Sequence, residues 1–285
     1  MAVFGSAAAL WVWVFFLGIT VGSFLNVVIM RGGRGEGTGG RSRCDACGRV
    51  LGVRELIPIV SFIFQKGRCR FCGAVLSWQY PLVECATGIA FVLAWWWLVV
   101  PVSVGLPPLA AGILALAAFA GVSAGVVIIV ADLRYQIIPN GAVVVVLLIG
   151  VLVSGWGRGI GIGHPPPGAD VPAFGASAVL ADGAAAILLA GLLALLWLFS
   201  RGQWMGLGDA KLVLATSLVT GFPRSLVAFL LSFWLGGIVG AVLLLWGDRG
   251  LKSRIPFGPF IIAGVALAYF FSDAFLAFFG LALVF

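Results

Sequence analysis

Charged residues are scarce in this sequence, making up 9% of its 285 residues, whereas an ordinary soluble domain has about 25%. Apolar residues make up 62%, against roughly 45 to 50% in a soluble domain. This shortage of charge excludes an ordinary soluble domain and predicts an all-α, polytopic membrane helix bundle. The sequence also lacks a basic stripe interleaved with aromatic residues, so we expect no nucleic acid partner for its net charge of +7.

The first apolar run has no basic flank before it and is too long for the apolar part of a secretory signal. Arg31 and Arg34 follow it directly, so we expect a permanent span rather than a cleaved peptide. Because each crossing needs about 20 apolar residues, we expect about eight transmembrane helices. The candidate spans are 8–30, 80–100, 108–131, 137–154, 177–199, 210–222, 225–246 and 259–272.

The distribution of basic residues predicts the orientation in the membrane. With the N-terminus outside, 15 of the 17 Lys and Arg residues fall inside and only Arg158 and Arg224 fall outside. Basic residues that flank spans stay on the cytoplasmic side. The net positive charge then follows from topology and from attraction to anionic lipid of the bilayer.

A polar insert separates the first two apolar runs. We therefore expect three parts: a first transmembrane helix (1–31), a cytoplasmic insert (32–79) and a transmembrane bundle (80–285). The insert begins with a glycine-rich stretch, which is typical of a flexible linker. It then carries two Cys-x-x-Cys pairs, a pattern that predicts a tetrahedral zinc site with four thiolate ligands. The four ligands are Cys44, Cys47, Cys69 and Cys72.

Two disulfides or four unrelated thiols are the alternatives to this metal site. A cytoplasmic location disfavours disulfides, because thiols there are kept reduced. The insert also has few apolar residues for a core of its own, so metal binding would supply folding free energy. We expect a structural Zn²⁺, since protein thiolates fill all four positions. Cys85 stands apart and is interpreted as a small buried apolar residue.

Two aspartates, Asp132 and Asp209, lie where long apolar runs meet the short polar segments 132–140 and 206–211. A carboxylate within hydrocarbon costs about 2.5 to 3.5 kcal/mol on insertion scales. In the predicted topology both reach the cytoplasmic face at the same depth. The remaining acidic residues near the spans are expected at the opposite face (Asp170, Asp182, Asp273) or, at the inner face, as a loop charge (Asp248) and a partner of a loop arginine (Glu84).

Such a pair can hydrolyse a peptide bond. Two carboxyl groups in one desolvated site do not both ionise easily, so one acts as base towards water while the protonated one polarises the carbonyl. Gly206 and Gly208 allow a tight turn near a substrate strand, and Pro139 ends a preceding helix. A single boundary aspartate is more often a helix cap or a lipid-facing anchor, and that alternative stays open for each residue alone.

Taken together, these segments resemble the type IV prepilin peptidase family, also called prepilin leader peptidases and N-methyltransferases. Its members are membrane aspartyl proteases of the Gly-x-Gly-Asp class. The resemblance runs nearly from end to end. It is carried, in order, by residues 22–31, the two cysteine pairs with 55–61 between them, 80–84, Asp132 with 138–139, 206–211 and 256–260.

The resemblance implies that Asp132 and Asp209 remove a short basic leader from type IV prepilin or pseudopilin precursors. It places this reaction at the cytoplasmic face of the bacterial inner membrane. It also implies N-methylation of the new terminus with S-adenosylmethionine, although the sequence has no glycine-rich strand-to-helix turn for such a cofactor. Lys211 belongs to the second aspartate's motif. Asn140 stands where many members have an aspartate, which indicates that this position tunes the site.

Two further regions have weaker interpretations. Glu84, at the entrance of the second span, is a candidate for positioning the positive terminus of a processed pilin or a basic leader residue; a salt bridge to the basic insert is the alternative. The segment 155–175 contains His164 and three prolines and matches nothing in the family. We expect it to be a disordered outer loop with a solvated histidine.

Two other functions fit the composition. In a non-enzymatic membrane carrier or transporter, the aspartates would relay protons, but such a path needs polar residues through the full depth of the membrane. In a protease that cuts within transmembrane helices, as presenilin-type enzymes do, the aspartates would lie deeper. Their shallow position favours a cut near the membrane surface.

Overall fold

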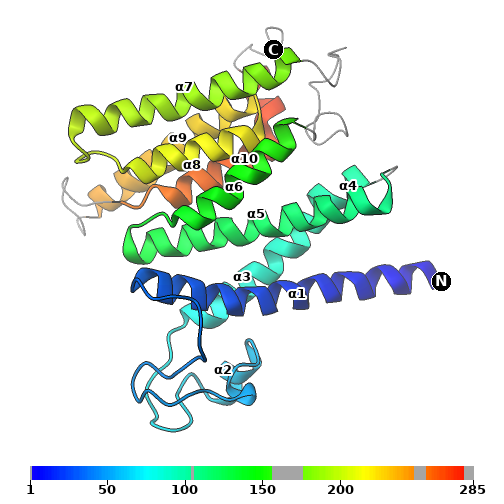
Figure 1. The fold of residues 1–285 in the computed structure, drawn as a ribbon, viewed down its shortest axis with the longest axis vertical. Helices are drawn as coiled ribbons and strands as arrows, with labels where there is room; N and C mark the ends of the chain where they lie inside the picture. The colour runs from blue at the N-terminus through cyan, green and yellow to red at the C-terminus, as the bar shows by residue number, and fades with distance from the viewer. Residues whose placement is uncertain (1, 104–105, 156–175, 247–254, 279–285) are drawn as a thin grey trace. The chain divides into compact units, whose positions relative to one another are not determined.

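The computed structural model describes residues 2–103, 106–155, 176–246 and 255–278, and they are mainly helical (Figure 1). These residues form no named strand, and their only β-type pairing is two isolated bridges, between Arg43 and Val50 and between Arg68 and Val75. The all-α class is therefore confirmed. The chain divides into two compact units, residues 1–127 and 128–285. The expected three-part division stays a prediction.

Six of the described helices are long and apolar enough to cross a membrane, which confirms a multi-pass membrane protein. A seventh helix, α6 (Asn140–Gly155), is apolar but shorter. Helix α3 (Gln79–Ala94) is followed without a break by the π-helical segment η2 (Trp95–Val99) and the short helix α4 (Val100–Ser103). The six are α1 (Ala2–Gly33), α3 (Gln79–Ala94) with η2, α5 (Pro108–Tyr135), α7 (Ala176–Ser200), α9 (Arg224–Leu245) and α10 (Gly258–Phe278).

The remaining expected helix, α8 (Leu207–Thr220), is different in kind. Its 14 residues span about 21 Å, less than the roughly 30 Å of hydrocarbon in a bilayer. It packs against α6, α7, α9 and α10 (Figure 1), and half of its residues are buried. A helix shielded in this way by its neighbours needs neither full length nor an apolar surface.

In the first unit, α1 and α3 pack at unusually close range. A Cβ added at Gly18 would lie 2.7 Å from the Gly88 Cα, and one at Gly22 would lie 2.9 Å from the Glu84 Cα. Only glycine permits this approach, as in the small-xxx-small pattern of membrane helix pairs. Phe91 of α3 also stacks on Phe119 of α5, with ring centroids 4.5 Å apart. The insert, which contains η1 (Val53–Glu55) and α2 (Val60–Phe64), thus joins two helices that are locked together.

The second unit is also tightly packed around α8. A Cβ at Gly150 of α6 would lie 2.7 Å from the Leu218 Cβ of α8. Helices α9 and α10 share a core that includes Val227 and Ala268. Buried Asp182 of α7 accepts a hydrogen bond from the Phe222 N–H, in the turn between α8 and α9, at 2.6 Å. The contacts of Leu218 and Phe222 hold the C-terminal end of α8, the helix whose first turn carries Asp209.

Several helix ends differ from the expected bounds, and two of these differences lie beside Asp132. Helix α5 continues past residue 131 to Tyr135, and Gln136, with φ of 54°, ends it. Helix α6 begins at Asn140 rather than 137, because residues before a proline disfavour the helical conformation. The expected outer loop, with His164, falls in 156–175, outside the described residues.

Candidate functional site

Asp132 lies in the last turn of α5 and is buried, with 5% of its surface exposed. Its Oδ2 accepts a hydrogen bond from the backbone N–H of Gly258, the first residue of α10, at 2.8 Å. The first N–H groups of a helix have no partner within it, so this carboxylate caps α10. A Cβ at Gly258 would lie 2.8 Å from the same Oδ2. The approach of Asp132 to the helix therefore depends on glycine at position 258.

Asp209 lies in the first turn of α8, and 8% of its surface is exposed. Its Oδ2 accepts a hydrogen bond from the Gly206 N–H at 3.2 Å, so it closes the turn that begins α8. A negative charge is favourable at this end of a helix. The carboxyl groups of Asp209 and Asp132 lie close enough for direct electrostatic interaction. The structure thus brings the two expected aspartates together within the second unit.

The neighbouring residues join the turn after α5 to the start of α8. A Cβ at Gly208 would lie 3.2 Å from the Ile138 Cβ, so this glycine allows close packing of the two segments. Lys211 donates a hydrogen bond from Nζ to Asn140 Oδ1 at 3.4 Å. Pro139 precedes α6, and its carbonyl accepts hydrogen bonds from the first free N–H groups of that helix, those of residues 142 and 143. Lys211 therefore contacts the start of α6.

Gly258 is a site residue whose role sequence reasoning missed. It lies in the segment 256–260, which resembled the family but received no role. Its contact with Asp132 joins residues 126 positions apart in the chain. Its only signal in the sequence is its position between Phe257 and Pro259. A contact between residues so far apart in the chain cannot be derived from a local pattern.

Glu84, in the first unit, is buried and holds a backbone group rather than a loop arginine. Its Oε2 accepts a hydrogen bond from the Ile59 N–H at 2.7 Å, and the Ser23 side chain also bonds to it. No ion pair of Glu84 is found in the described part of the chain. Ile59 has a φ of 60°, which is an outlier for a β-branched residue. Glu84 therefore stabilises a strained turn of the insert.

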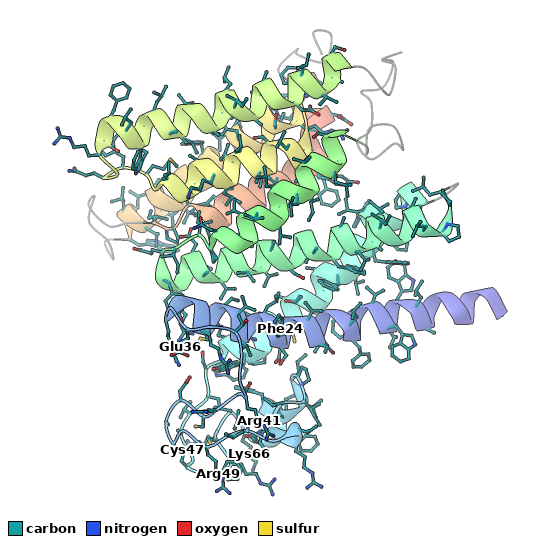
Figure 2. All side chains as sticks on the ribbon, in the orientation of Figure 1. Phe24, Glu36, Arg41, Cys47, Arg49 and Lys66 are labelled. Atoms are coloured by element: carbon teal, nitrogen blue, oxygen red, sulfur yellow. The ribbon has the colours of Figure 1, made fainter. Side chains whose placement is uncertain are left out.

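The four cysteines of the insert converge. Their sulfur atoms all lie within 4.8 Å of one another, and the Cys44 and Cys72 sulfurs are 3.9 Å apart. Four sulfurs about 2.3 Å from a tetrahedrally bound Zn²⁺ would be about 3.8 Å apart, so the donor set and spacing fit this ion. Figure 2 shows Cys47 within the folded insert, beside Arg49. The cluster can hold a metal ion.

The two cysteine pairs lie in two loops of the same design. In each loop a glycine with positive φ follows the second cysteine, Gly48 at 69° and Gly73 at 72°. Its N–H donates to the carbonyl of the first cysteine, at 2.8 and 2.9 Å. In the second loop the N–H groups of Cys72 and Phe71 bond to the sulfur of Cys69 and lower the pKa of its thiol to about 7. This favours the thiolate form of Cys69, the form that binds metal, whereas burial and the neighbouring cysteines raise the pKa of Cys72 to about 11.

Ion pairs and backbone bonds fix the rest of the insert. Arg34 pairs with Asp45 at 3.0 Å and Arg70 with Glu55 at 3.5 Å. The Arg31 guanidinium donates to the carbonyl groups of Thr38, Gly39 and Arg41, which orders the glycine-rich stretch after α1. Cys85 lies on α3 and is not part of the sulfur cluster.

Comparison with known proteins places this architecture in a family. The profile described as "Type IV leader peptidase family" matches residues 119–241, and that described as "Bacterial Peptidase A24 N-terminal domain" matches residues 16–98. No solved structure matches the chain.

Relatives of this chain include the prepilin leader peptidase/N-methyltransferase of Bacillus subtilis (strain 168), which is 32% identical over 84% of this chain and 85% of the relative. A protein of the same name from Burkholderia pseudomallei (strain 1026b) is 30% identical over 91% of this chain and 84% of the relative. A third, from Myxococcus xanthus (strain DK1622), is 49% identical over 28% of this chain and 24% of the relative. This chain therefore belongs to the type IV leader peptidase family.

Proposed function

We propose that this protein is a membrane aspartyl endopeptidase in which Asp132 and Asp209 cleave the leader from type IV prepilin or pseudopilin precursors. The pairing of two buried carboxyl groups, one at the end of α5 and one at the start of α8, carries this proposal. The relatives named prepilin leader peptidases support the substrate class.

The pair acts on water and on the peptide carbonyl. The ionised carboxylate removes a proton from water while the protonated carboxyl donates a hydrogen bond to the carbonyl oxygen, and the hydroxide adds to the carbonyl carbon. A proton then passes to the leaving nitrogen as the C–N bond breaks. The two protonation states belong to the pair, so acid and base roles are not assigned to individual residues.

The glycine donors keep the carboxyl groups in place during this reaction. Gly258 and Gly206 each donate a backbone N–H to one oxygen, Oδ2, of Asp132 and Asp209 respectively. Gly208 keeps the α8 start against Ile138, Pro139 begins α6, and Lys211 ties α8 to Asn140. These residues position the site and take no part in proton transfer.

The membrane orientation follows the distribution of basic residues. With the N-terminus outside, the insert and the aspartate pair lie on the cytoplasmic side of the bacterial inner membrane. A short basic leader would reach the aspartates from that side. The junction between leader and apolar helix of a prepilin would then lie near the surface, at the depth where both α5 ends and α8 begins.

The four cysteines are assigned to a structural Zn²⁺. Protein thiolates occupy all four tetrahedral positions, so no position remains for water or substrate. Cys44 and Cys69 are buried, and the ion would replace the apolar core that the insert lacks. Purified protein should contain about one equivalent of zinc, as expected for such a closed site.

N-methylation of the new terminus is proposed from the relatives' names, which include N-methyltransferase. S-adenosylmethionine would supply an electrophilic methyl group to the terminal amine. The described residues include no strand followed by a glycine-rich turn into a helix, the arrangement that commonly holds nucleotide-like cofactors. The relatives' names alone therefore support this activity.

A carrier with proton-relaying aspartates is not favoured. Its pair would serve a path through the membrane, whereas both carboxyl groups here are held by backbone N–H groups at helix ends. The described relatives are enzymes by name.

Leader removal from a model prepilin in membranes tests the proposal. Asp132→Asn and Asp209→Asn keep an oxygen that can accept the glycine N–H, so α10 and α8 stay capped while proton transfer is lost. Each variant should cleave about 10² to 10⁴ times more slowly than wild type, the usual contribution of general acid–base catalysis.

Asp273→Asn is the matched control, because Asp273 is exposed and pairs with Arg224 at 3.6 Å. It should cleave at the wild-type rate. Equal thermal unfolding temperatures in detergent would show that all three variants are folded. Near wild-type cleavage by either Asp132→Asn or Asp209→Asn would remove that residue from the mechanism.

A further inference from the structure

An unusual set of apolar side chains is exposed on the insert. We call it the apolar edge, and its members are Val53, Leu56, Ile57, Val60, Ile63 and Phe64. Val53, Ile63 and Phe64 are 80%, 66% and 83% exposed, whereas Phe62 of the same helix turns inward. Several exposed apolar side chains within one short segment of a small polar module indicate a contact with a protein or a membrane.

The insert holds this edge beside the membrane-spanning helices. Ile59, in the middle of the edge, donates its N–H to Glu84, five residues into the span that begins at Gln79. At 1.5 Å per residue, Glu84 lies about 7.5 Å along α3 from the start of the span. Its side chain leans back towards that start, since Cβ atoms tilt to the helix N-terminus. Ile59 therefore lies close to the level at which the bilayer begins.

A second contact fixes the same level. The Phe62 ring packs on the Trp78 ring, with centroids 4.9 Å apart, and Trp78 directly precedes α3. Trp78 is itself largely exposed. Tryptophan is enriched at the boundary between headgroups and hydrocarbon. Helix α2 is thus attached at the depth of an interfacial aromatic residue.

Charge around the edge indicates which occupant it suits. Residues 31–79 contain nine Lys and Arg but only three Asp and Glu. Arg54 lies at one end of the edge, and Lys66 (Figure 2) and Arg68 follow at the other. Basic residues next to an apolar surface match anionic headgroups above acyl chains.

We propose that the apolar edge inserts into the headgroup and upper acyl region of the bilayer and anchors the insert to anionic phospholipid. The edge would then lie flat in the leaflet into which α1 and α3 emerge. This role is separate from peptide cleavage. Because Ile59 and Phe62 attach the edge near the start of α3, lipid covers it without any additional protein.

Depth measurement by spin label tests the anchor. In a Cys85→Ala parent, Phe64→Cys is labelled with the zinc site loaded, and the full-length protein is placed in nanodiscs of phosphatidylethanolamine and phosphatidylglycerol. Collision with oxygen and with a water-soluble nickel chelate then gives the depth of the label. We expect it about 5 to 10 Å below the phosphates, the usual depth of an interfacial helix.

Two positions calibrate this measurement. Gly37→Cys, where a Cβ meets nothing within 4 Å, reports an exposed part of the insert and should collide with nickel. Phe16→Cys, on the exposed surface of α1, reports lipid and should collide with oxygen. The unaltered parent should take up no label, which excludes reaction at the zinc thiolates.

The comparison has three outcomes. Accessibility at position 64 resembling that at position 16 supports the anchor. Accessibility resembling that at position 37 overturns it. If position 64 is open to nickel and becomes protected only when a model prepilin is added, the edge binds substrate and the lipid proposal is equally overturned.

Discussion

The insert and the aspartate site hold their reactive side chains in place in different ways. In the insert, the four cysteines come from two loops of one local design, Arg43–Val50 and Arg68–Val75. At the aspartate site, Asp132, Asp209 and their glycine donors come from the ends of α5, α8 and α10. In the proposed assignment an ion holds the first, whereas helix packing and two backbone hydrogen bonds hold the second. A local module depends on its ligand, and an assembled site depends on close contact between distant segments.

Removal of the metal should break the insert and leave the aspartate site folded. A structural zinc site contributes about 10 to 16 kcal/mol in zinc-finger peptides, so Cys69→Ser should lose the zinc and unfold the insert. Limited trypsin digestion should then cut between residues 41 and 70, where many arginines lie. Cys85→Ser, outside the sulfur cluster, is the control and should keep its zinc and its resistance. An insert that resists trypsin without bound metal would contradict the assignment.

Among substitutions outside the aspartate pair itself, enlarging Gly258 should have the largest effect on the assembled site. In Gly258→Ala the new Cβ would lie 2.8 Å from Asp132 Oδ2 and must displace it. A misplacement of about 1 Å can reduce a catalysed rate about 10²-fold, and we expect a loss of leader cleavage of that order. Gly237→Ala, where a Cβ on α9 meets nothing within 4 Å, is the matched control and should keep the wild-type rate. Normal cleavage by Gly258→Ala would mean that the contact with Asp132 does not position it for catalysis.

Substitution of Glu84 should have a smaller effect, and it tests whether this residue positions substrate as well as connecting the insert to α3. Glu84→Gln keeps an oxygen for the Ile59 N–H but loses the charge. If the charge also positions a basic part of the substrate, KM should rise roughly tenfold, equal to about 1.4 kcal/mol, with kcat unchanged.

Glu84→Ala removes the acceptor altogether and leaves the Ile59 N–H without it, at a cost of about 1 to 3 kcal/mol. It should make the insert easier to digest with trypsin. Wild-type kcat and KM in Glu84→Gln would end the substrate-positioning hypothesis and leave Glu84 as a support for the strained turn at Ile59.

The smallest effect is expected at Lys211. Its single hydrogen bond to Asn140, at 3.4 Å, contributes at most about 1 kcal/mol. Lys211→Ala and Asn140→Ala should each reduce thermal stability slightly, and the double variant should lose less than the sum of the two, as expected for residues in contact. Strict additivity would show that the bond contributes nothing. A loss of cleavage as large as that of Asp209→Asn would instead place Lys211 in the chemistry.

Sequence alone predicted the parts of this protein that depend on local pattern. The helices follow from apolar length, and the cysteine loops follow from the two Cys-x-x-Cys pairs with their glycines. The proximity of Asp132 and Asp209 was predicted from the direction of the helices. What could not be predicted were contacts between distant segments, such as Gly258 with Asp132 and Ile59 with Glu84.

Helix α8 also shows why local sequence pattern is insufficient, because distant segments form its surroundings. It was expected as a short span, yet its length and polarity make sense only once α6, α7, α9 and α10 are seen around it. A helix that its neighbours largely enclose needs no long apolar run in its sequence. The sequence signal for such a helix is therefore weak, even when the helix carries a residue as important to the proposal as Asp209.

The glycine hydrogen bonds have a consequence for the direction of the chemistry. In each aspartate Oδ2 is engaged by a backbone N–H, while no described residue donates a hydrogen bond to either Oδ1. In the proposed mechanism, water and the peptide carbonyl would therefore meet the two Oδ1 atoms, which the backbone donors leave open. Two glycine N–H groups would in this way favour one face of the peptide carbonyl, and so one handedness of the tetrahedral intermediate.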